Sequence, residues 1–523
     1  MDVLAYSIVG VLGGVVSYVV CKCLLLQLRW SKWLRTVPGP PCPSFWYGNL
    51  CDLLRRDIVP VFLEWSAEYG GVVRIWGTFG EPRLLVTDPV AVDHVLRRKA
   101  YSYPKVRVVQ RLLAGLMGDG MLVAEGDVHK RQKRAIQPGF SGRSIRKLAP
   151  IFDRHAHALS DHLLHVSGDV GVLSDIYKLM GCTALDALGS AAFHIEFGTL
   201  ESVRNDKQGR AHATHPLTAA FEHALDIATR TSLAKNLFDA LTMIFPALEI
   251  FPIGFTSFQF RSASRVLFRV AEQIVREAKA SILGPDTGLY CATNEEERPD
   301  LLATLLRANT NAQRPKTEKT SILDRAALTD DELVAQLSTF IFAGHETTAT
   351  QMTWLLLMLS RHPYVQEKLR SEIRATRTRL GLAVHGQSGA RDEHRDLSMD
   401  ELEALPYLDW CIRESLRLHG AIHTTSRMAA ERDVIPAQDG RCTLVEKDTI
   451  IMIPLAAISQ DPTLWGEDAH TFRPERWAEP MPGAQTYSSY GGLSFLQGPR
   501  ACIGRQFGTF RDSRSNRRNE IIY

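Results

Sequence analysis

A ten-residue stretch near the C-terminus constrains this chain most. Residues 495–504 read FLQGPRACIG and follow the pattern F-x-x-G-x-R-x-C-x-G, from Phe495 to Gly504. A cysteine thiolate such as that of Cys502 needs a positive partner and backbone N–H donors, and a metal ion is the strongest such partner. Glycines let the backbone pass close to a flat ligand, and Arg500 can pair bidentately with a carboxylate on it, such as a haem propionate. The alternative, a structural cysteine in a glycine-rich turn, explains fewer of the fixed positions.

The overall charge argues against one class of function. The 523 residues carry 61 Lys and Arg against 58 Asp and Glu, a net charge of +3, which is too balanced for a nucleic-acid-binding protein. The nine cysteines are scattered without a C-x-x-C pair. This argues against a zinc site or a disulfide framework and fits a reducing compartment. No repeat or linker divides the chain after its first few dozen residues, so we expect one large, mainly α-helical domain behind an N-terminal appendage.

The start of the chain, residues 1–28, is predicted to be a transmembrane anchor. Residues 3–21 carry no charged side chain, and roughly 20 such residues span a bilayer. Asp2 precedes the apolar run and basic residues follow it from Lys22 onward, so the positive-inside tendency places the remainder in the cytosol. A cleaved signal peptide is the rival interpretation, but its basic start and small-residue cleavage site are missing. Residues 29–48, basic and then proline-rich, are predicted to form a stiff hinge.

Local patterns predict short helices and strands after the hinge. Residues 61–69 have helical spacing, 72–76 and 83–86 are β-prone runs, and 89–98 read as a helix with proline at its start. Residues 100–124 show no such pattern and are predicted to be irregular.

A long helix is predicted from Thr329 to about Ser360, because Thr329 begins an S/T-x-x-E capping box. Its middle reads AGHETT, so that a carboxylate, Glu346, lies beside a hydroxyl, Thr347. Such a pair can relay protons through water. The alternative is a helix kinked at Gly344 whose threonines bond back to backbone carbonyls.

Further motifs complete a family pattern. Glu414 and Arg417 lie at i and i+3 of a predicted helix, and Arg476 follows in a Pro-Glu-Arg-Trp segment. With the relay pair and the cysteine stretch, the order and spacing of these motifs resemble the cytochrome P450 family, fungal microsomal type, over about residues 38–506. The resemblance implies a mainly α fold with small β-sheets behind the anchor. It also implies haem b whose iron is axially ligated by Cys502.

The resemblance also implies roles for the remaining residues. Glu346 and Thr347 would be catalytic, and the cofactor would be held by His129, Lys133, Arg427, Phe495, Arg500 and Gly504. Glu414, Arg417 and Arg476 would form a buried charge triad behind the cysteine loop. Many family members have Trp in place of His129 and Arg in place of Lys133, so weaker, single-point contacts are expected there. The basic run 129–134 suits docking of an acidic electron donor or, equally, is a solvated helix face.

The activity implied is that of a haem-thiolate monooxygenase, which inserts one oxygen atom of O2 into a lipophilic small molecule. The implied partners are NADPH-cytochrome P450 reductase, the substrate and membrane lipid, without nucleic acid. The implied location is the endoplasmic reticulum membrane, single-pass, with a cytosolic catalytic domain. Fungal secondary metabolism, with terpenoids as a plausible substrate class, is the pathway expected. The alternatives are a haem-thiolate isomerase or dehydratase, and an inactive truncated remnant.

The C-terminal residues depart from the family pattern. The catalytic domain is expected to span residues 49–510, and 511–523 to form an aberrant polar tail, because no apolar stripe follows Phe510. The chain therefore resembles a truncated or frameshifted member. We expect a helix to begin over residues 503–507 and no ordered structure after about Phe510.

Overall fold

The structure of this chain is a computed structural model. It describes residues 36–167, 175–205, 255–283, 301–313, 327–382, 397–479, 486–487, 492–511 and 520–522, together with Ser17. The predicted anchor, residues 1–28, lies outside this described part except for Ser17, as does the hinge before residue 36. Within the part that is described, no helix combines the length and apolarity needed to cross a bilayer.

Helices make up most of the described chain. In its first half they are α2 (Leu50–Arg55), α3 (Ile58–Tyr69), α4 (Pro89–Asp93), α5 (Arg107–Met117), α6 (Gly126–Ile136), α7 (Gly142–Arg146), α8 (Ala149–Ser167), α9 (Ile176–Leu188), α10 (Thr199–Asn205) and α13 (Phe255–Leu283). The later ones are α14 (Leu301–Gln313), α15 (Asp330–Arg361), α16 (Pro363–Arg379), α17 (Met399–Glu403), α18 (Pro406–His419), α19 (Leu455–Ile458), α20 (Pro462–Trp465) and α22 (Arg505–Gly508). Short 3-10 or π-helical turns also occur. They are η1 (Thr78–Gly80), η2 (His94–Arg98), η3 (Gln137–Phe140), η4 (Gly189–Phe193), η6 (Pro474–Ala478) and η7 (Gly498–Arg500). The mainly α expectation is confirmed.

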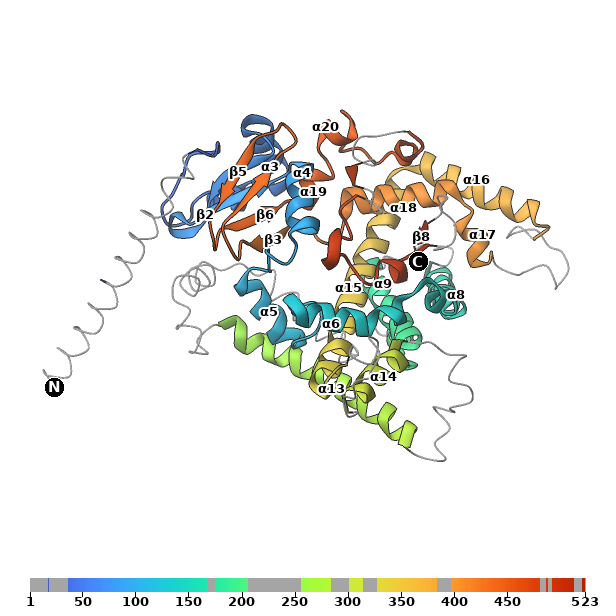
Figure 1. Ribbon diagram of the computed structural model, residues 1–523. Helices are drawn as coiled ribbons and strands as arrows, with labels where there is room; N and C mark the ends of the chain where they lie inside the picture. The colour runs from blue at the N-terminus through green and yellow to red at the C-terminus, as the bar shows by residue number, and fades with distance from the viewer. Residues whose placement is uncertain are drawn as a thin grey trace, which may run out of the picture.

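Two of the small β-sheets occupy one end of the molecule, and a third, short strand pair lies among the helices (Figure 1). The largest has the strand order β1-β2-β6-β3, formed by β1 (Val72–Trp76), β2 (Pro82–Val86), β6 (Ile450–Ile453) and β3 (Thr425–Met428). β2 and β6 are parallel, whereas the other neighbours are antiparallel, with Val73 opposite Leu85 and Arg427 opposite Ile451. The strands β4 (Asp433–Pro436) and β5 (Cys442–Val445) form a separate hairpin. The first half of the chain thus shares a sheet with residues more than 300 positions later.

α15 runs through the centre of the molecule, with α5 and α6 on one side and α18 on another (Figure 1). Its predicted capping box is confirmed: Thr329 N–H donates to Glu332 Oε2 at 3.0 Å, and Glu332 N–H donates to Thr329 Oγ1 at 3.2 Å. Leu337, Phe340 and Ile341 of α15 lie in an apolar cluster with side chains from α5, α6, α9, α13 and α14. This cluster places the AGHETT segment of α15 deep within the helical part.

Two local expectations need correction. Residues 100–124 are not wholly irregular, because α5 occupies Arg107–Met117. No side chain caps its start at Val106, so the sequence carries no helix-start signal there. The helix predicted over 89–98 is divided into α4 and the π-helical turn η2.

The end of the described chain also differs from expectation. α22 begins after the cysteine loop, as expected, and ends at Gly508. It is followed by an antiparallel strand pair, β7 (Thr509–Arg511) with β8 (Glu520–Ile522). The prediction of no ordered structure after Phe510 is therefore wrong for these strands. Residues 512–519 lie outside the described part.

Candidate functional site

The cysteine loop closes on itself through backbone hydrogen bonds. Cys502 N–H donates to the Phe495 carbonyl at 2.9 Å, and Ala501 N–H donates to that of Gly498 at 3.1 Å. Gly498 has a φ of +78°, and a Cβ there would lie 2.2 Å from the carbonyl oxygen of Leu96. Only glycine fits at this position. Gly504 is less constrained, since a Cβ there would meet Cys502 Sγ at 3.8 Å, an ordinary contact.

The Cys502 side chain is accessible to solvent, yet protein surrounds it closely. Burial raises the pKa of its thiol, while the N–H groups of Gly504 and Arg505 and the positive charge of Arg505 oppose that rise. A side chain that is both accessible and strongly desolvated faces a recess in the molecule and not its outer surface. A bound metal ion would deprotonate a thiol in such a recess.

Basic side chains converge beside the cysteine loop. We call this group the basic cluster; its members are Lys105, His129, Lys133, Arg427 and Arg500.

Two of the members come from α6. His129 is 4% exposed, and its Nδ1 lies 3.1 Å from the Tyr101 hydroxyl. Burial and the nearby cations Arg500, Lys105 and Lys133 lower its pKa to about 4, so His129 is neutral at pH 7. Lys133 Nζ donates to the carbonyl of Pro499 at 2.6 Å and so ties α6 to the cysteine loop.

Arg427, from β3, is also buried. Its Nη1 donates to Thr425 Oγ1 at 2.7 Å and to the Ser426 carbonyl at 2.9 Å. Burial and the positive charge of Arg500 lower its pKa to about 10. A guanidinium whose pKa is lowered carries an uncompensated charge, which a carboxylate would relieve.

Arg500 lacks hydrogen bonds that its position calls for. Its side chain is 5% exposed, its guanidinium lies 5.0 Å from the centre of the Tyr101 ring, and Nη2 forms an ion pair with Glu125 Oε2. Among the described residues, neither Nη1 nor Nη2 has a hydrogen-bond partner of acceptable geometry. Buried donors normally find acceptors, so the Nη1 donor, which has no acceptor among the described residues, fits a carboxylate ligand in the recess.

Glu125 is the one carboxylate that pairs with the basic cluster within the described part of the chain. Its Oε1 accepts from Lys105 N at 3.0 Å and lies 3.1 Å from Lys105 Nζ. Burial nevertheless lowers the pKa of Lys105 to about 8, with Glu125 opposing and Arg500 adding to the shift. The cluster therefore holds more positive than negative charge. The two propionates of a haem would supply the missing negative charge, so the residues present fit this cofactor.

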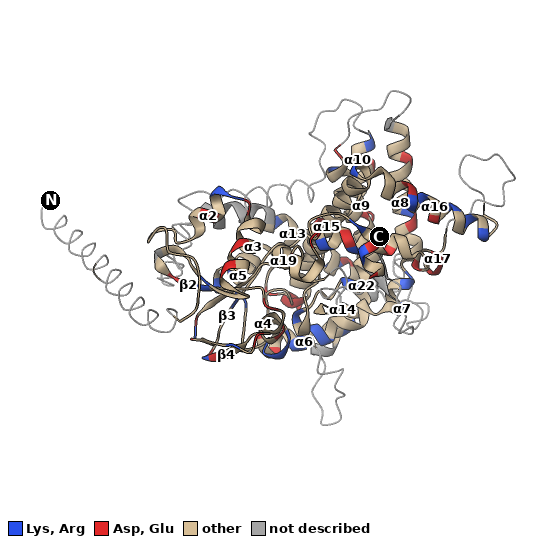
Figure 2. Ribbon diagram, turned by 90° about the horizontal axis from the view of Figure 1, so that it is seen from above, with Lys and Arg blue, Asp and Glu red and all other residues tan. Residues whose placement is uncertain are grey.

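α6 carries further Lys and Arg residues (Figure 2), and some of them are committed to other contacts. Arg131 pairs with Glu332 at the start of α15, and Lys130 pairs with Asp127 at 2.9 Å. Arg134 is exposed. The run 129–134 is thus not a uniform solvated face.

The three residues of the predicted charge triad lie in contact with one another. Glu414 accepts from Arg417 Nε at 2.9 Å and Nη2 at 2.8 Å, and from Arg476 Nε at 3.2 Å. All three residues are at most 1% exposed. Trp477 Nε1 also donates to Glu414, and Asp468 accepts from Arg476 Nη1 at 2.7 Å. The triad has two positive charges and one negative charge, and the carboxylate of Asp468 balances the excess positive charge.

The triad helix, α18, also supports the cysteine loop. Ser494 Oγ donates to the carbonyl of Leu416 at 2.8 Å, and Phe495 packs against Ile412 and Leu416. Phe495 therefore anchors the loop to α18.

The α15 segment carries the two other predicted residues. Glu346 Oε1 accepts from the Tyr177 hydroxyl of α9, and Thr347 Oγ1 donates to the carbonyl of Ala343 at 2.6 Å. The back-bonding alternative thus describes the hydroxyl of Thr347 in this structure, while α15 stays helical through Gly344. A Cβ on Gly344 would lie 3.2 Å from Leu188, so this glycine allows α9 to approach and does not face a ligand.

The cysteine loop and α15 meet in one apolar cluster. Ile503 and Phe507, which follow Cys502, pack against the cluster that contains Phe340 and Ile341 of α15. The ribbon shows α15 passing beside this segment (Figure 1).

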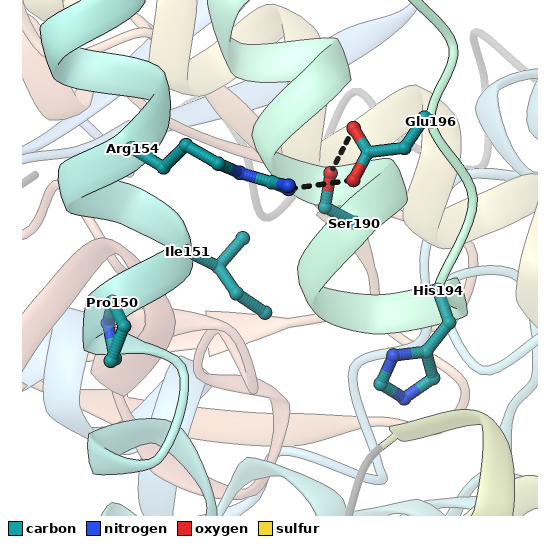
Figure 3. A pocket seen from close by; sticks show the side chains of 6 residues that line it. All are labelled: Pro150, Ile151, Arg154, Ser190, His194 and Glu196. Atoms are coloured by element: carbon teal, nitrogen blue, oxygen red, sulfur yellow. Dashed lines mark hydrogen bonds and ion pairs between the residues drawn. The ribbon is translucent and has the colours of Figure 1, made fainter.

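A separate pocket of about 390 Å³ lies between α8 and the end of α9 (Figure 3). Its lining is Pro150, Ile151, Arg154, Ser190, His194 and Glu196. Arg154 and Glu196 bridge it at 2.6 Å. None of the predicted site residues lines it, so it is distinct from the cysteine recess.

Sequence reasoning missed several residues of the recess. Tyr101 and Lys105 lie in the stretch predicted to be irregular, Glu125 directly follows it, and no motif marks them. Gly498 stands in the cysteine pattern, but its steric requirement depends on the distant Leu96 carbonyl. Three His, Cys, Asp or Glu side chains suited to a metal ion do not come together among the described residues.

Comparison with known proteins supports the pattern. The family model of cytochrome P450 matches residues 38–511. Cytochrome P450 monooxygenase 128 of Postia placenta is 32% identical over 505 residues, covering 92% of this chain and 84% of the relative. Ganoderic acid synthetase CYP5150L8 of Ganoderma lucidum is 31% identical, covering 91% and 84%. Cytochrome P450 monooxygenase claQ of Ampulloclitocybe clavipes is 29% identical, covering 94% and 87%. The chain therefore belongs to the cytochrome P450 family of haem-thiolate monooxygenases.

Proposed function

We propose that this chain is a membrane-attached monooxygenase of fungal secondary metabolism that oxidises a lipophilic small molecule. The observation that carries the proposal is the recess at Cys502, where an accessible thiol stands beside a basic cluster with unused hydrogen-bond donors. Both features suit a planar cofactor that brings a metal ion and two carboxylates.

Cys502 is the proposed axial ligand of the haem iron. Its thiolate would be held by the N–H groups of Gly504 and Arg505. Haem, when bound, supplies the binding and activation of O2, and a thiolate ligand favours cleavage of the O–O bond. Phe495 holds the loop on α18, so the thiolate position is fixed before the cofactor arrives.

The basic cluster is the proposed receptor for the propionates. Arg500 and Arg427 offer planar, bidentate donors, whereas Lys133 and Lys105 offer point charges. His129 is neutral and serves as a hydrogen-bond donor or acceptor, not as a charge. The predicted propionate contacts are thus joined by Lys105, which the sequence pattern does not mark.

Glu346 and Thr347 are the proposed proton relay. Glu346 can take a proton from solvent, and the Thr347 hydroxyl, whose own hydrogen is donated to the Ala343 carbonyl, can accept a hydrogen bond from water beside it. Retention of this pair favours a monooxygenase over an isomerase or dehydratase, which needs no protons for oxygen chemistry.

Electrons are proposed to come from NADPH through a cytochrome P450 reductase, with the catalytic domain held in the cytosol by the N-terminal anchor at the endoplasmic reticulum. The exposed Arg134 belongs to the basic run that could meet an acidic partner. One relative bears the name ganoderic acid synthetase, which supports a secondary metabolite as substrate. Terpenoids are the class we propose to test first.

The test is oxygen incorporation. Membranes that contain the chain and a fungal reductase are supplied with NADPH, ¹⁸O-labelled dioxygen and a panel of terpenoids. We expect a product that carries one labelled oxygen atom and requires NADPH. Product formed without NADPH and without label would show an isomerase or dehydratase. An intact fold that retains no haem would show an inactive remnant.

A further inference from the structure

The phenol of Tyr177 reaches Glu346 from the neighbouring helix α9. Tyr177 stands in the first turn of α9, just after Asp175, whose side chain caps that helix by accepting from Lys178 N–H at 3.1 Å. Tyr177 is 39% exposed, and its hydroxyl donates to Glu346 Oε1 and also reaches Thr350. One side chain therefore joins solvent to the carboxylate of the proposed relay.

Glu346 lies between two faces of α15. His345 and Ala349 form the face against α9, where Ala349 packs on Met180. At about 100° per residue, Thr347 points about 200° away from His345, and Glu346 lies about 100° from each. Rotation about its side-chain bonds can therefore turn the Glu346 carboxylate toward α9 or toward the Thr347 face.

We propose that Tyr177 is a positioning residue that holds the Glu346 carboxylate on the solvent side of α15 between proton transfers. This inference rests on the proposed function, since it assigns Glu346 to proton supply.

Glu346 would carry one proton at a time from solvent to the Thr347 face of α15. A solvent proton adds to the ionised Glu346, and the neutral acid then turns and gives that proton to water beside Thr347. The carboxylate that remains returns to Tyr177. Protonation itself releases the carboxyl group, because a hydrogen bond to an ionised acceptor is about twice as strong as one to a neutral acceptor.

Tyr177 keeps its own proton throughout. Burial and the hydrogen bond to Glu346 raise its pKa to about 12, with a smaller contribution from the charge of Asp175. Another titratable neighbour is His345, whose Nδ1 lies 3.9 Å from Glu346 Oε2. Burial lowers the pKa of His345 to about 4, so it is neutral and does not compete for the carboxylate at pH 7.

The first test replaces one hydroxyl. Tyr177→Phe should lower product formed per NADPH by about tenfold, since a positioned acid contributes more than that to rate. Peroxide should rise in proportion, and the solvent isotope effect on product formation should increase. Tyr364→Phe is the matched control: Tyr364 is 74% exposed at the start of α16, and its loss should change none of these quantities.

The second test asks whether Tyr177 acts through Glu346. In a Glu346→Gln background, Tyr177→Phe should have no further effect on the ratio of product to peroxide. A readout without turnover is tyrosinate absorbance after a rapid jump to about pH 11. The loss of tyrosinate absorbance on replacing Tyr177 by Phe should be small in the wild-type background. It should be larger in the Glu346→Gln background, because the carboxylate that suppresses ionisation of Tyr177 is gone.

Unchanged coupling in Tyr177→Phe, or an effect that adds in full to Glu346→Gln, would overturn the inference. In either case the wild type would still show a thiolate-type carbon monoxide spectrum and NADPH-dependent turnover, so the proposed function would stand. A wild type that shows neither would overturn both. Thermal unfolding at the same temperature in both tyrosine variants would confirm that the fold is not the cause.

Discussion

Two ionic groups flank the cysteine loop, and they differ in how completely they are paired. In the triad, Glu414 meets both arginines, and within the described chain no buried polar atom of Glu414, Arg417 or Arg476 lacks a hydrogen bond. In the basic cluster, Nη1 of Arg500 has no hydrogen-bond partner among the described residues, and burial lowers the pKa of Lys105 and Arg427.

This difference in pairing distinguishes an ionic group with a structural role from one that binds a ligand. A buried ionic network that is fully paired has nothing left to offer a ligand, and breaking it leaves an uncompensated charge. A buried group with surplus positive charge is costly by itself and gains when an anion binds. We therefore assign the triad to holding α18 behind the loop, and the basic cluster to the cofactor.

The largest expected effect comes from breaking the triad. Glu414→Gln should leave two buried arginines without their shared carboxylate and lower the free energy of unfolding by about 3–5 kcal/mol. Denaturant unfolding of the apoprotein measures this loss. Asp409→Asn is the matched control: Asp409 lies on the same helix in a two-residue ion pair with Arg413. A Glu414→Gln loss no larger than that of the control would contradict the structural assignment.

A matched pair of arginine substitutions tests the contrast directly. Arg417→Met should destabilise the apoprotein strongly, whereas Arg500→Met should leave its unfolding free energy unchanged or higher, because a surplus charge is removed. Arg500→Met should instead weaken haem binding by about 10- to 100-fold, the loss of one or two charge-assisted hydrogen bonds. Haem transfer to a competing apoprotein measures the affinity. Equal destabilisation of the apoprotein by both substitutions would contradict the proposed distinction between the triad and the basic cluster.

Burial holds the pKa of Lys105 at about 8, below its ordinary 10.5, so the unfolded chain binds more protons between these values. Stability of the apoprotein should therefore rise with pH through this window. Propionates favour the charged amine, so haem binding should take up a proton above pH 8, and the dissociation constant should rise by about tenfold from pH 7 to pH 9.

Lys105→Met is the control for this pH dependence. It should bind haem more weakly at pH 7 and lose most of the change between pH 7 and pH 9. A dissociation constant of the wild type that stays flat over this range would show that Lys105 does not face the carboxylates.

The smallest effect is expected at Lys133. Its ammonium already donates to the Pro499 carbonyl, so only part of its hydrogen-bonding capacity is free. Lys133→Arg should slow haem loss by a factor of about 2–5, since a guanidinium can serve the carbonyl and a carboxylate together. Faster haem loss would mean that the Pro499 contact cannot be replaced.

The triad and the basic cluster also differ in how far the sequence alone predicts them. Glu414 and Arg417 share one helix face and the cysteine pattern is contiguous, so local spacing marks them. The grouping of Glu414 and Arg417 with Arg476, like the assignment of His129, Lys133, Arg427 and Arg500 to the cofactor, came from the family resemblance. The basic cluster draws on α6, β3, the cysteine loop and the segment around Lys105. These segments are far apart in the sequence and are joined by contacts such as the bridge between Lys105 and Arg427 and the hydrogen bond from Lys133 to the Pro499 carbonyl. Pairing between residues so far apart leaves no local signal.

In the helical core, too, local sequence signals predict some features and not others. The capping box at Thr329 fixed the start of α15, whereas α5 has no cap and escaped prediction. From the sequence alone Gly344 is a candidate kink, but α15 stays helical there and the role of this glycine is set by Leu188 of α9, a contact that periodicity does not reveal.

The most direct test of the account is the carbon monoxide difference spectrum of the reduced, purified chain. We predict the long-wavelength Soret band of thiolate-ligated haem in the wild type, and its loss in Cys502→Ala. The same band in Cys502→Ala, or a wild-type spectrum typical of a neutral ligand, would contradict the assignment of Cys502 and its recess as the haem site.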